Sequence, residues 1–176
     1  MAVADPLITA LRPGPWSAGE AVARAVARSL LPEEDPAPPP GWLFPAQARS
    51  FRRVLAAIRR FHGALLADPV GSGKTYVALA VAQAMGKRAR TACLVPASLV
   101  AQWEVTAARL GILVAVTSHQ RVSRGGLPAE ARGLVIIDES HHFRNPRTRR
   151  YLHLAPWLVG RPVLLLTATP DRKSVV

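Results

Sequence analysis

The arrangement of apolar runs limits the fold of this chain more than any other feature. From Gly41 onward, runs of five to seven mostly apolar residues alternate with segments of helical spacing. The predicted strands are 63–67, 91–95, 112–116, 133–138 and 162–168, and the predicted helices are 46–61, 74–85, 98–110 and 148–158. Strands that are apolar along their whole length are typical of a parallel sheet covered by helices on both faces. The pattern predicts an α/β domain of three layers with a mostly parallel, five-stranded sheet.

Residues 1–40 differ from the rest of the chain. Segment 17–31 predicts a helix with Ser17 as its cap, and apolar residues recur at every fourth position, Val22, Val26 and Leu30. The proline-rich stretch 32–40 that follows cannot form a regular helix or sheet ladder, so we expect an extended linker or surface connection. The predicted organisation is therefore a helical appendage with a linker over 1–40 and one domain over 41–176.

Charge and composition narrow the classes of function. The 23 basic and 11 acidic side chains leave a net charge of +12, which favours a polyanionic partner such as nucleic acid, although arginine-rich codon usage would give the same excess. The single cysteine, Cys93, excludes an internal disulfide and is expected in the core. We find neither a secretory signal nor an apolar run of about 18 residues. We therefore expect a cytoplasmic protein without a membrane partner.

The stretch ADPVGSGKT, Ala67–Thr75, lies between a predicted strand and a predicted helix. Glycines let the backbone curl so that several N–H groups face one anion, and the start of the helix adds its positive end. Lys74 supplies a charge for the terminal phosphates, and the Thr75 hydroxyl can bind magnesium. The stretch predicts a phosphate-binding loop whose amides run from Gly71 through Ser72 and Gly73 to Thr75. Asp68 stands where such loops usually begin with glycine.

An acidic pair follows the predicted strand that ends at Ile137. Carboxylates at the carboxyl end of a buried parallel strand point into the crevice where ligands bind. Asp138 is placed to hold magnesium through water, and Glu139 is placed to orient or deprotonate an attacking water. Alone, the pair would fit a solvated loop, but together with the phosphate loop it predicts a catalytic role for Lys74, Asp138 and Glu139.

Three other clusters give weaker signals. The hydroxyl residues Thr167 and Thr169 follow the last predicted strand and can sense the state of the nucleotide. Arginines lie around HHFRNPRTRR and along 49–60, where they can either contact phosphates or form solvated helix faces. Trp103 and Trp157 lie on predicted helices and are expected in the core rather than in base stacking.

In this order, these motifs resemble those of the superfamily 2 helicases and translocases, the Swi/Snf-like branch in particular. LLADPVGSGKT is similar to LADEMGLGKT, LVPASLVAQW to the PASLL-x-QW segment, VIIDESHHFRN to VIIDEAHxIKN, and LLLTATP to the wider superfamily. FPAQARSF resembles the upstream PYQ element. The resemblance covers residues 41–170, with Pro69 in place of a Glu and Ser140 in place of an Ala.

The resemblance implies a RecA-like P-loop NTPase lobe that binds ATP and Mg²⁺ and acts with double-stranded DNA. It makes Gln47 the adenine-contacting glutamine and extends the binding set through Asp68, Pro69 and Val70 to the glycine loop. It also places 96–99 and 117–120 against the nucleic acid backbone, and gives Thr167 and Thr169 a role in coupling hydrolysis to lobe movement. Family members close a second RecA-like lobe, which carries an arginine finger, over the ATP.

Two alternatives to a DNA-dependent ATPase lobe remain open at this level. We expect no second lobe within these 176 residues, so the chain could be a nucleotide-binding module without catalysis. Loss of the arginine finger would slow hydrolysis by ~10³-fold or more. A metabolite kinase could use the same loop, although the PASLVAQW segment and the lack of an obvious lid argue against it.

Overall fold

The structure is a computed structural model that describes residues 18–30, 33–86, 90–128 and 133–168, without the side chains of 27–30. The chain forms two compact units, residues 1–31 and residues 32–176. The first unit contains helix α2, Gly19–Leu30, whose Val22 and Val26 side chains are exposed. The predicted cap at Ser17 lies outside the described residues.

Strands β1 to β5 form one parallel sheet in the second unit, as the sequence predicts. They are β1 Gly63–Leu66, β2 Thr91–Val95, β3 Val114–Ser118, β4 Val135–Ile137 and β5 Val163–Leu166, in the order β1-β5-β4-β2-β3. Every neighbouring pair is parallel, so the carboxyl ends of all the strands meet at one edge of the sheet. The loops that follow the strands therefore share that edge.

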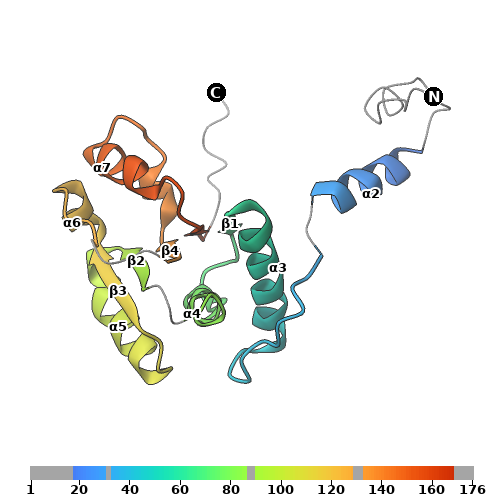
Figure 1. The fold of residues 1–176 in the computed structure, drawn as a ribbon, viewed down its shortest axis with the longest axis horizontal. Helices are drawn as coiled ribbons and strands as arrows, with labels where there is room; N and C mark the ends of the chain where they lie inside the picture. The colour runs from blue at the N-terminus through green and yellow to red at the C-terminus, as the bar shows by residue number, and fades with distance from the viewer. Residues whose placement is uncertain (1–17, 31–32, 87–89, 129–132, 169–176) are drawn as a thin grey trace, which may run out of the picture. The chain divides into compact units, whose positions relative to one another are not determined.

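Helices cover both faces of the sheet, so the predicted three-layer α/β fold is confirmed (Figure 1). Alternate strand residues point to opposite faces. One face, with Cys93, Ile136 and Leu164, packs against α3 Pro45–Phe61, α4 Lys74–Ala84 and α5 Val100–Arg109. The opposite face, with Leu94, Val135 and Ile137, packs against α6 His119–Ser123, the 3₁₀ turn η2 Ser140–Phe143 and α7 Arg149–Leu158.

Helix α4 is buried on nearly every side. The residues from Val77 to Ala82 are all buried, so the helix has no polar face. This composition is typical of a helix enclosed by other elements. Since α4 begins at Lys74, its burial fixes the position of the phosphate loop relative to the sheet.

The proline-rich segment 33–40 is anchored on α3. Asp35 is only 6% exposed, and its carboxylate accepts hydrogen bonds from Arg59 Nη1 at 2.6 and 2.9 Å and from the Ala37 amide at 2.9 Å. The Asp35 amide donates to the Arg52 carbonyl at 3.3 Å. Glu34 also pairs with Arg53, so acidic residues of this segment neutralise part of the basic face of α3.

The sequence placed the third strand too early and missed α6. β3 begins at Val114, whereas Ile112 lies in the turn after α5 and its amide donates to the Ala107 carbonyl at 2.9 Å. At the other end, the Ser118 hydroxyl caps α6 by accepting from the Arg121 amide at 3.2 Å. Local capping thus converts the predicted turn at 117–120 into the end of a strand and the start of a helix. None of the described helices is long and apolar enough to cross a membrane.

Candidate nucleotide-binding site

The glycine loop connects β1 to α4 with two residues in the left-handed region. Gly71 has φ 79° and Gly73 has φ 82°, a conformation that other residues adopt only with strain. Gly73 is the N-cap of α4, and no side chain caps this end of the helix among the described residues. The Tyr76 amide donates to the Gly73 carbonyl at 2.9 Å, so only the N–H groups that precede Tyr76 have no acceptor within the helix and can face an anion.

Lys74 extends across the loop rather than away from it. Its Nζ donates to the Asp68 carbonyl at 2.7 Å and to the Pro69 carbonyl at 3.0 Å. Both carbonyls belong to the loop itself, so the ammonium group is held against the loop. A phosphate group at the loop would meet this cation without a large movement of the chain.

Gln47 contacts the phosphate loop from α3. Its Nε2 donates to the Ser72 carbonyl at 3.0 Å, while its Oε1 accepts from the Phe44 amide at 3.1 Å and caps α3. A Cβ atom at Gly73 would collide with Gln47 Nε2. Both ends of the amide thus bind the protein, and close approach of Gln47 to the loop requires glycine at position 73.

Two cavities lie beside the loop. The first, of about 320 Å³, brings together Val70, Gly71, Gly73, Lys74 and Thr75 of the loop with Asp138 and Glu139. The second, of about 330 Å³, is lined by Gln47, Asp68, Pro69 and Ser72, together with Ser50 and two arginines of α3. Ser50 donates to the Asp68 carboxylate at 3.1 Å. The predicted binding residues therefore divide into a phosphate-loop cavity and a neighbouring polar cavity.

Asp138 extends the edge of the sheet into the phosphate-loop cavity. Its amide donates to the Leu94 carbonyl at 2.9 Å, which continues the ladder between β4 and β2. Its carboxylate accepts from Trp103 Nε1 at 3.1 Å and from the Glu139 amide at 2.9 Å. Burial raises the pKa of Asp138, while these two hydrogen bonds and the charge of Lys74 oppose the rise.

Glu139 adopts a backbone conformation that is rare for glutamate. Its φ of 46° lies in the left-handed region and turns the chain from β4 into η2. The carboxylate lies 3.3 Å from His141 Nδ1. Strained residues of this kind are concentrated at functional sites.

The oxygen donors at this site fit magnesium. The Thr75 hydroxyl and the Asp138 carboxylate line one cavity, and Mg²⁺ prefers oxygen ligands while it keeps several waters and substrate phosphates. Within the described residues, no group of three or more His, Cys, Asp or Glu side chains is placed to hold a metal ion. A cation here would therefore depend on the Thr75 hydroxyl, the Asp138 carboxylate and the phosphates.

The residues after β5 are only partly described. Thr167 is buried, and its amide donates to the Leu66 carbonyl at 3.1 Å. It lines a different, largely apolar cavity of about 540 Å³, whereas its neighbour Ala168 lines the phosphate-loop cavity. Thr169 lies outside the described residues.

Trp103 is the residue that sequence reasoning undervalued. The prediction that it belongs to the core is confirmed, since it is 1% exposed, but its indole also reaches the candidate site through Asp138. Tyr76, Gln102 and Thr106 also line the cavity and were not predicted. These residues lie on α4 and α5, and the sequence alone does not show which face of each helix borders the cavity.

Comparison with known proteins finds several that are similar to this chain. The family model described as "Type III restriction enzyme, res subunit" (ResIII) matches residues 42–112. The chain is 34% identical over 134 residues to the "Uncharacterized ATP-dependent helicase YqhH" of Bacillus subtilis, covering 64% of this chain and 24% of that protein. It is also 34% identical over 128 residues to the bovine "SWI/SNF-related matrix-associated actin-dependent regulator of chromatin subfamily A-like protein 1", covering 60% of this chain and 14% of that protein.

A solved structure shares the fold. The "Sulfolobus solfataricus SWI2/SNF2 ATPase core in complex with dsDNA" matches with a TM-score of 0.62 and 21% sequence identity, covering 77% of this chain and 34% of that one. The chain spans about a quarter or less of the length of the two curated relatives. The residues matched by the family model, 42–112, include β1, the glycine loop, α4 and β2.

Proposed function

Because this chain carries the N-terminal, RecA-like lobe of the superfamily 2 helicases and translocases, of the Swi/Snf-like type, we propose that it binds ATP at the glycine loop. We further propose that, with a second RecA-like lobe, it couples ATP hydrolysis to movement along double-stranded DNA. The observation that carries the proposal is the phosphate-loop cavity, where Lys74 and Thr75 meet Asp138 and Glu139.

Each residue of the cavity has a distinct role in this proposal. The amides from Gly71 to Thr75 and the Lys74 ammonium bind the phosphates and offset their charge. Magnesium, held by the Thr75 hydroxyl and by Asp138 through water, would neutralise the charge that develops on the transferred phosphoryl group. Glu139 orients the attacking water and accepts its proton.

The remaining predicted residues act around this centre. Gln47 fixes the loop through Ser72 and borders the polar cavity beside it, where the adenine ring would lie. Thr167 and Thr169 would pass the state of the nucleotide to the second lobe. Since Thr167 joins β5 to the carbonyl of Leu66 at the start of the loop, a shift of the loop would reach it directly.

Binding of a fluorescent ATP analogue tests the proposal first. We expect saturable, magnesium-dependent binding by the 176-residue chain and a loss of about 10-fold or more in Lys74→Ala. Arg109→Ala removes an equal charge from the exposed last turn of α5 and should leave binding unchanged. Absence of binding by the folded wild-type chain, or equal binding by Lys74→Ala, would reject the loop as the nucleotide site.

Turnover separates an ATPase lobe from a nucleotide-binding module without catalysis. Steady-state hydrolysis should be measured with the chain alone, with duplex DNA, and with a second RecA-like lobe supplied in trans. The proposed function predicts that DNA and the second lobe together raise the rate. Nucleotide binding with no hydrolysis in any of these mixtures would favour the module instead.

A further inference from the structure

The indole of Trp103 donates a buried hydrogen bond to a carboxylate of the candidate site. Trp103 lies on α5, is 1% exposed, and its Nε1 is 3.1 Å from Asp138 Oδ2. The indole has one donor and no acceptor, and a buried tryptophan N–H usually finds a partner. Here that partner is the acidic residue that follows β4, rather than a nearby main-chain carbonyl.

Donors from two different elements hold the Asp138 carboxylate. Oδ2 accepts from Trp103 on α5, and Oδ1 accepts from the amide of Glu139 at 2.9 Å. A carboxylate oxygen can accept more than one hydrogen bond, so each oxygen keeps acceptor capacity. With one donor on each oxygen, rotation of the carboxylate about its Cβ–Cγ bond would break both bonds.

The positions of Trp103 and Asp138 indicate which site the remaining acceptor capacity of the Asp138 oxygens serves. Trp103 and Asp138 both line the cavity that contains Lys74 and Thr75. The ring of Trp103 also packs in the hydrophobic cluster that α3, α4 and α5 form on the sheet. Packing in the core therefore fixes the position of the Trp103 ring, and the indole N–H in turn restrains the Asp138 carboxylate.

We propose that Trp103 is a positioning residue that orients the Asp138 carboxylate, through its indole N–H, for magnesium-assisted nucleotide binding. The proposal rests on the proposed function, because it assumes that Asp138 serves the magnesium ion. Hydrogen-bond partners of metal-binding carboxylates typically change metal affinity by about 10- to 100-fold when they are removed. Trp103 would then determine the magnesium dependence of binding and not the affinity of the loop for phosphates.

The test measures binding of a fluorescent ATP analogue over a range of Mg²⁺ concentrations and without Mg²⁺. Trp103→Phe removes the donor but also leaves a cavity in the core. Replacement of Trp103 by benzothienylalanine removes only the donor, because sulfur takes the place of the indole N–H in a ring of nearly the same shape. Trp157→Phe is the matched control, since Trp157 is half-buried on α7 and stacks on Arg161 away from the site.

The expected result is a weaker affinity for Mg²⁺ with no change in the affinity of the loop for the nucleotide itself. The benzothienylalanine variant should need about 10-fold more Mg²⁺ for half-maximal binding, with unchanged affinity in the absence of Mg²⁺. Trp157→Phe should match the wild type in both. Asp138→Asn should lose the magnesium dependence and, combined with the benzothienylalanine change, should show no further loss.

A second readout does not depend on nucleotide. The four tryptophans give four indole N–H resonances in a ¹⁵N–¹H spectrum, and Trp103→Phe identifies the one from Trp103. Asp138→Asn should shift that resonance more than the other three. An unchanged resonance would show that the hydrogen bond does not form in solution and would overturn the proposal.

The failures of the two proposals can be told apart. If Asp138→Asn weakens magnesium-dependent binding while the benzothienylalanine variant matches the wild type, the role of Trp103 is wrong and the proposed function stands. If the wild type shows no magnesium-dependent binding, or Asp138→Asn leaves it unchanged, the proposed magnesium site is wrong, and the role of Trp103 fails with it.

Discussion

Glu139 combines two features that are rarely found in one residue. It carries a carboxylate at the phosphate-loop cavity, and its φ of 46° costs about 1–3 kcal/mol for a residue that is not glycine. The left-handed turn separates Glu139 from Asp138, so that two consecutive carboxylates can serve different atoms. The local backbone conformation thus fits the separate roles proposed for Asp138 at the metal and for Glu139 at the attacking water.

Glu139→Gln should separate nucleotide binding from turnover. The amide has nearly the same shape but cannot accept a proton from water, so we expect a loss of about 10²- to 10⁴-fold in hydrolysis and little change in affinity. Both should be measured on the same preparation, in the mixture of chain, DNA and second lobe that hydrolyses ATP. Turnover near the wild-type rate would remove Glu139 from the catalytic residues.

Gly73 should tolerate substitution less well than Gly71. Both have positive φ, so alanine at either position costs about 1–2 kcal/mol of backbone strain. Only at Gly73 would the new Cβ meet Gln47 Nε2, whereas the space beside Gly71 is open. Urea unfolding should therefore show a larger loss of stability in Gly73→Ala than in Gly71→Ala.

The double variant provides the control for this comparison. Gln47→Ala removes the side chain that a Cβ at Gly73 would meet, so it should recover part of the extra loss in Gly73→Ala. The strain from φ would remain. Equal costs at the two glycines would mean that Gln47 can move away from the loop, and that its contact with Ser72 is weak.

At the scale of elements, α6 is attached to the sheet through His119. The ring is buried, its Nε2 lies 3.2 Å from the Leu94 carbonyl, and it packs edge-on against Phe143 of η2. Burial, together with the nearby His142 and Arg150, lowers the pKa of His119 to about 4, while its hydrogen bonds to the main chain oppose this shift. The histidine is therefore neutral in the folded protein at pH 7.

Acid should destabilise the fold through His119. The unfolded histidine takes up a proton near pH 6.5, whereas the folded one does so near pH 4, so stability falls as the pH drops through this window. Between pH 7 and pH 5 we expect a loss of about 2 kcal/mol from this residue, measured by urea unfolding.

His119→Gln is the control for the pH dependence. It keeps a donor for the Leu94 carbonyl but has no proton to bind, so the loss of stability between pH 7 and pH 5 should largely disappear. The comparison is needed because Asp138 acts in the opposite direction: its raised pKa favours the folded state as the pH falls. Identical pH profiles for the two proteins would contradict the neutral, buried state of His119.

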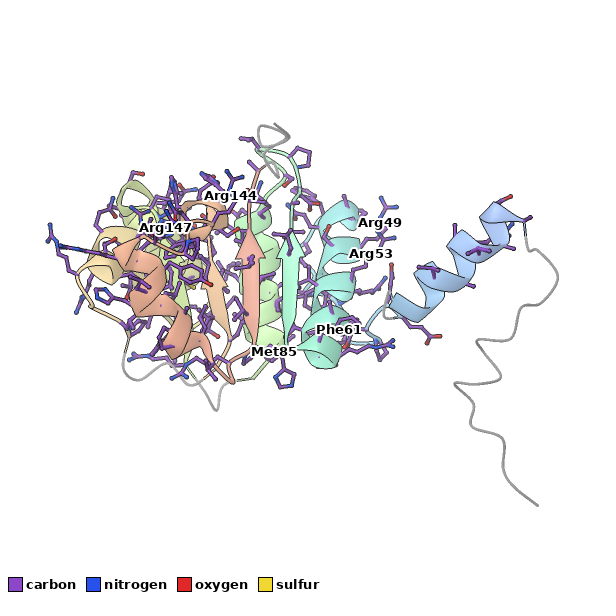
Figure 2. All side chains as sticks on the ribbon, turned by 90° about the horizontal axis from the view of Figure 1, so that it is seen from above. Arg49, Arg53, Phe61, Met85, Arg144 and Arg147 are labelled. Carbon is purple, nitrogen blue, oxygen red and sulfur yellow. The ribbon has the colours of Figure 1, made fainter. Side chains whose placement is uncertain are left out.

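At the scale of the whole second unit, the parallel sheet gathers the functional loops at one edge. The ends of β4, β2 and β3 are neighbours in the sheet, and β1 lies at its opposite side. Arg144 and Arg147 follow β4, whereas Arg49 and Arg53 belong to α3 beside β1 (Figure 2). The first pair is therefore closer to the segments that the resemblance assigns to nucleic acid.

Duplex DNA binding should depend more on the first pair of arginines than on the second. With a net charge of +12, we expect affinity to fall steeply with salt. Arg144→Gln with Arg147→Gln should reduce the slope of log affinity against log salt by about 2, one for each lost phosphate contact. Arg49→Gln with Arg53→Gln makes the same change in charge on α3 and should affect the slope less. A larger change in slope for the Arg49 and Arg53 variant would indicate that DNA binds on the α3 side instead.

The sequence by itself determined the order of elements and the chemistry of the loop. Continuous apolar runs predict buried strands, and Gly71 to Thr75 between a strand and a helix predict a phosphate loop. Both features can be read from residues that are close together in the sequence. Motif order also gave the resemblance to the superfamily 2 helicases and translocases. By contrast, the sequence predicted the third strand at 112–116, whereas pairing with β2 places β3 at Val114–Ser118.

Only the tertiary structure decided which residues that are distant in the sequence come into contact. It joined Gln47 to Ser72, Asp35 to Arg59 and Trp103 to Asp138, which are pairs with no signal in sequence spacing. These contacts depend on the order in which strands pair and on the face that each helix buries. Local propensities do not encode that arrangement, since it results from packing the whole hydrophobic surface at once. The chain thus specifies the loop locally, whereas the geometry of the candidate site exists only in the folded sheet.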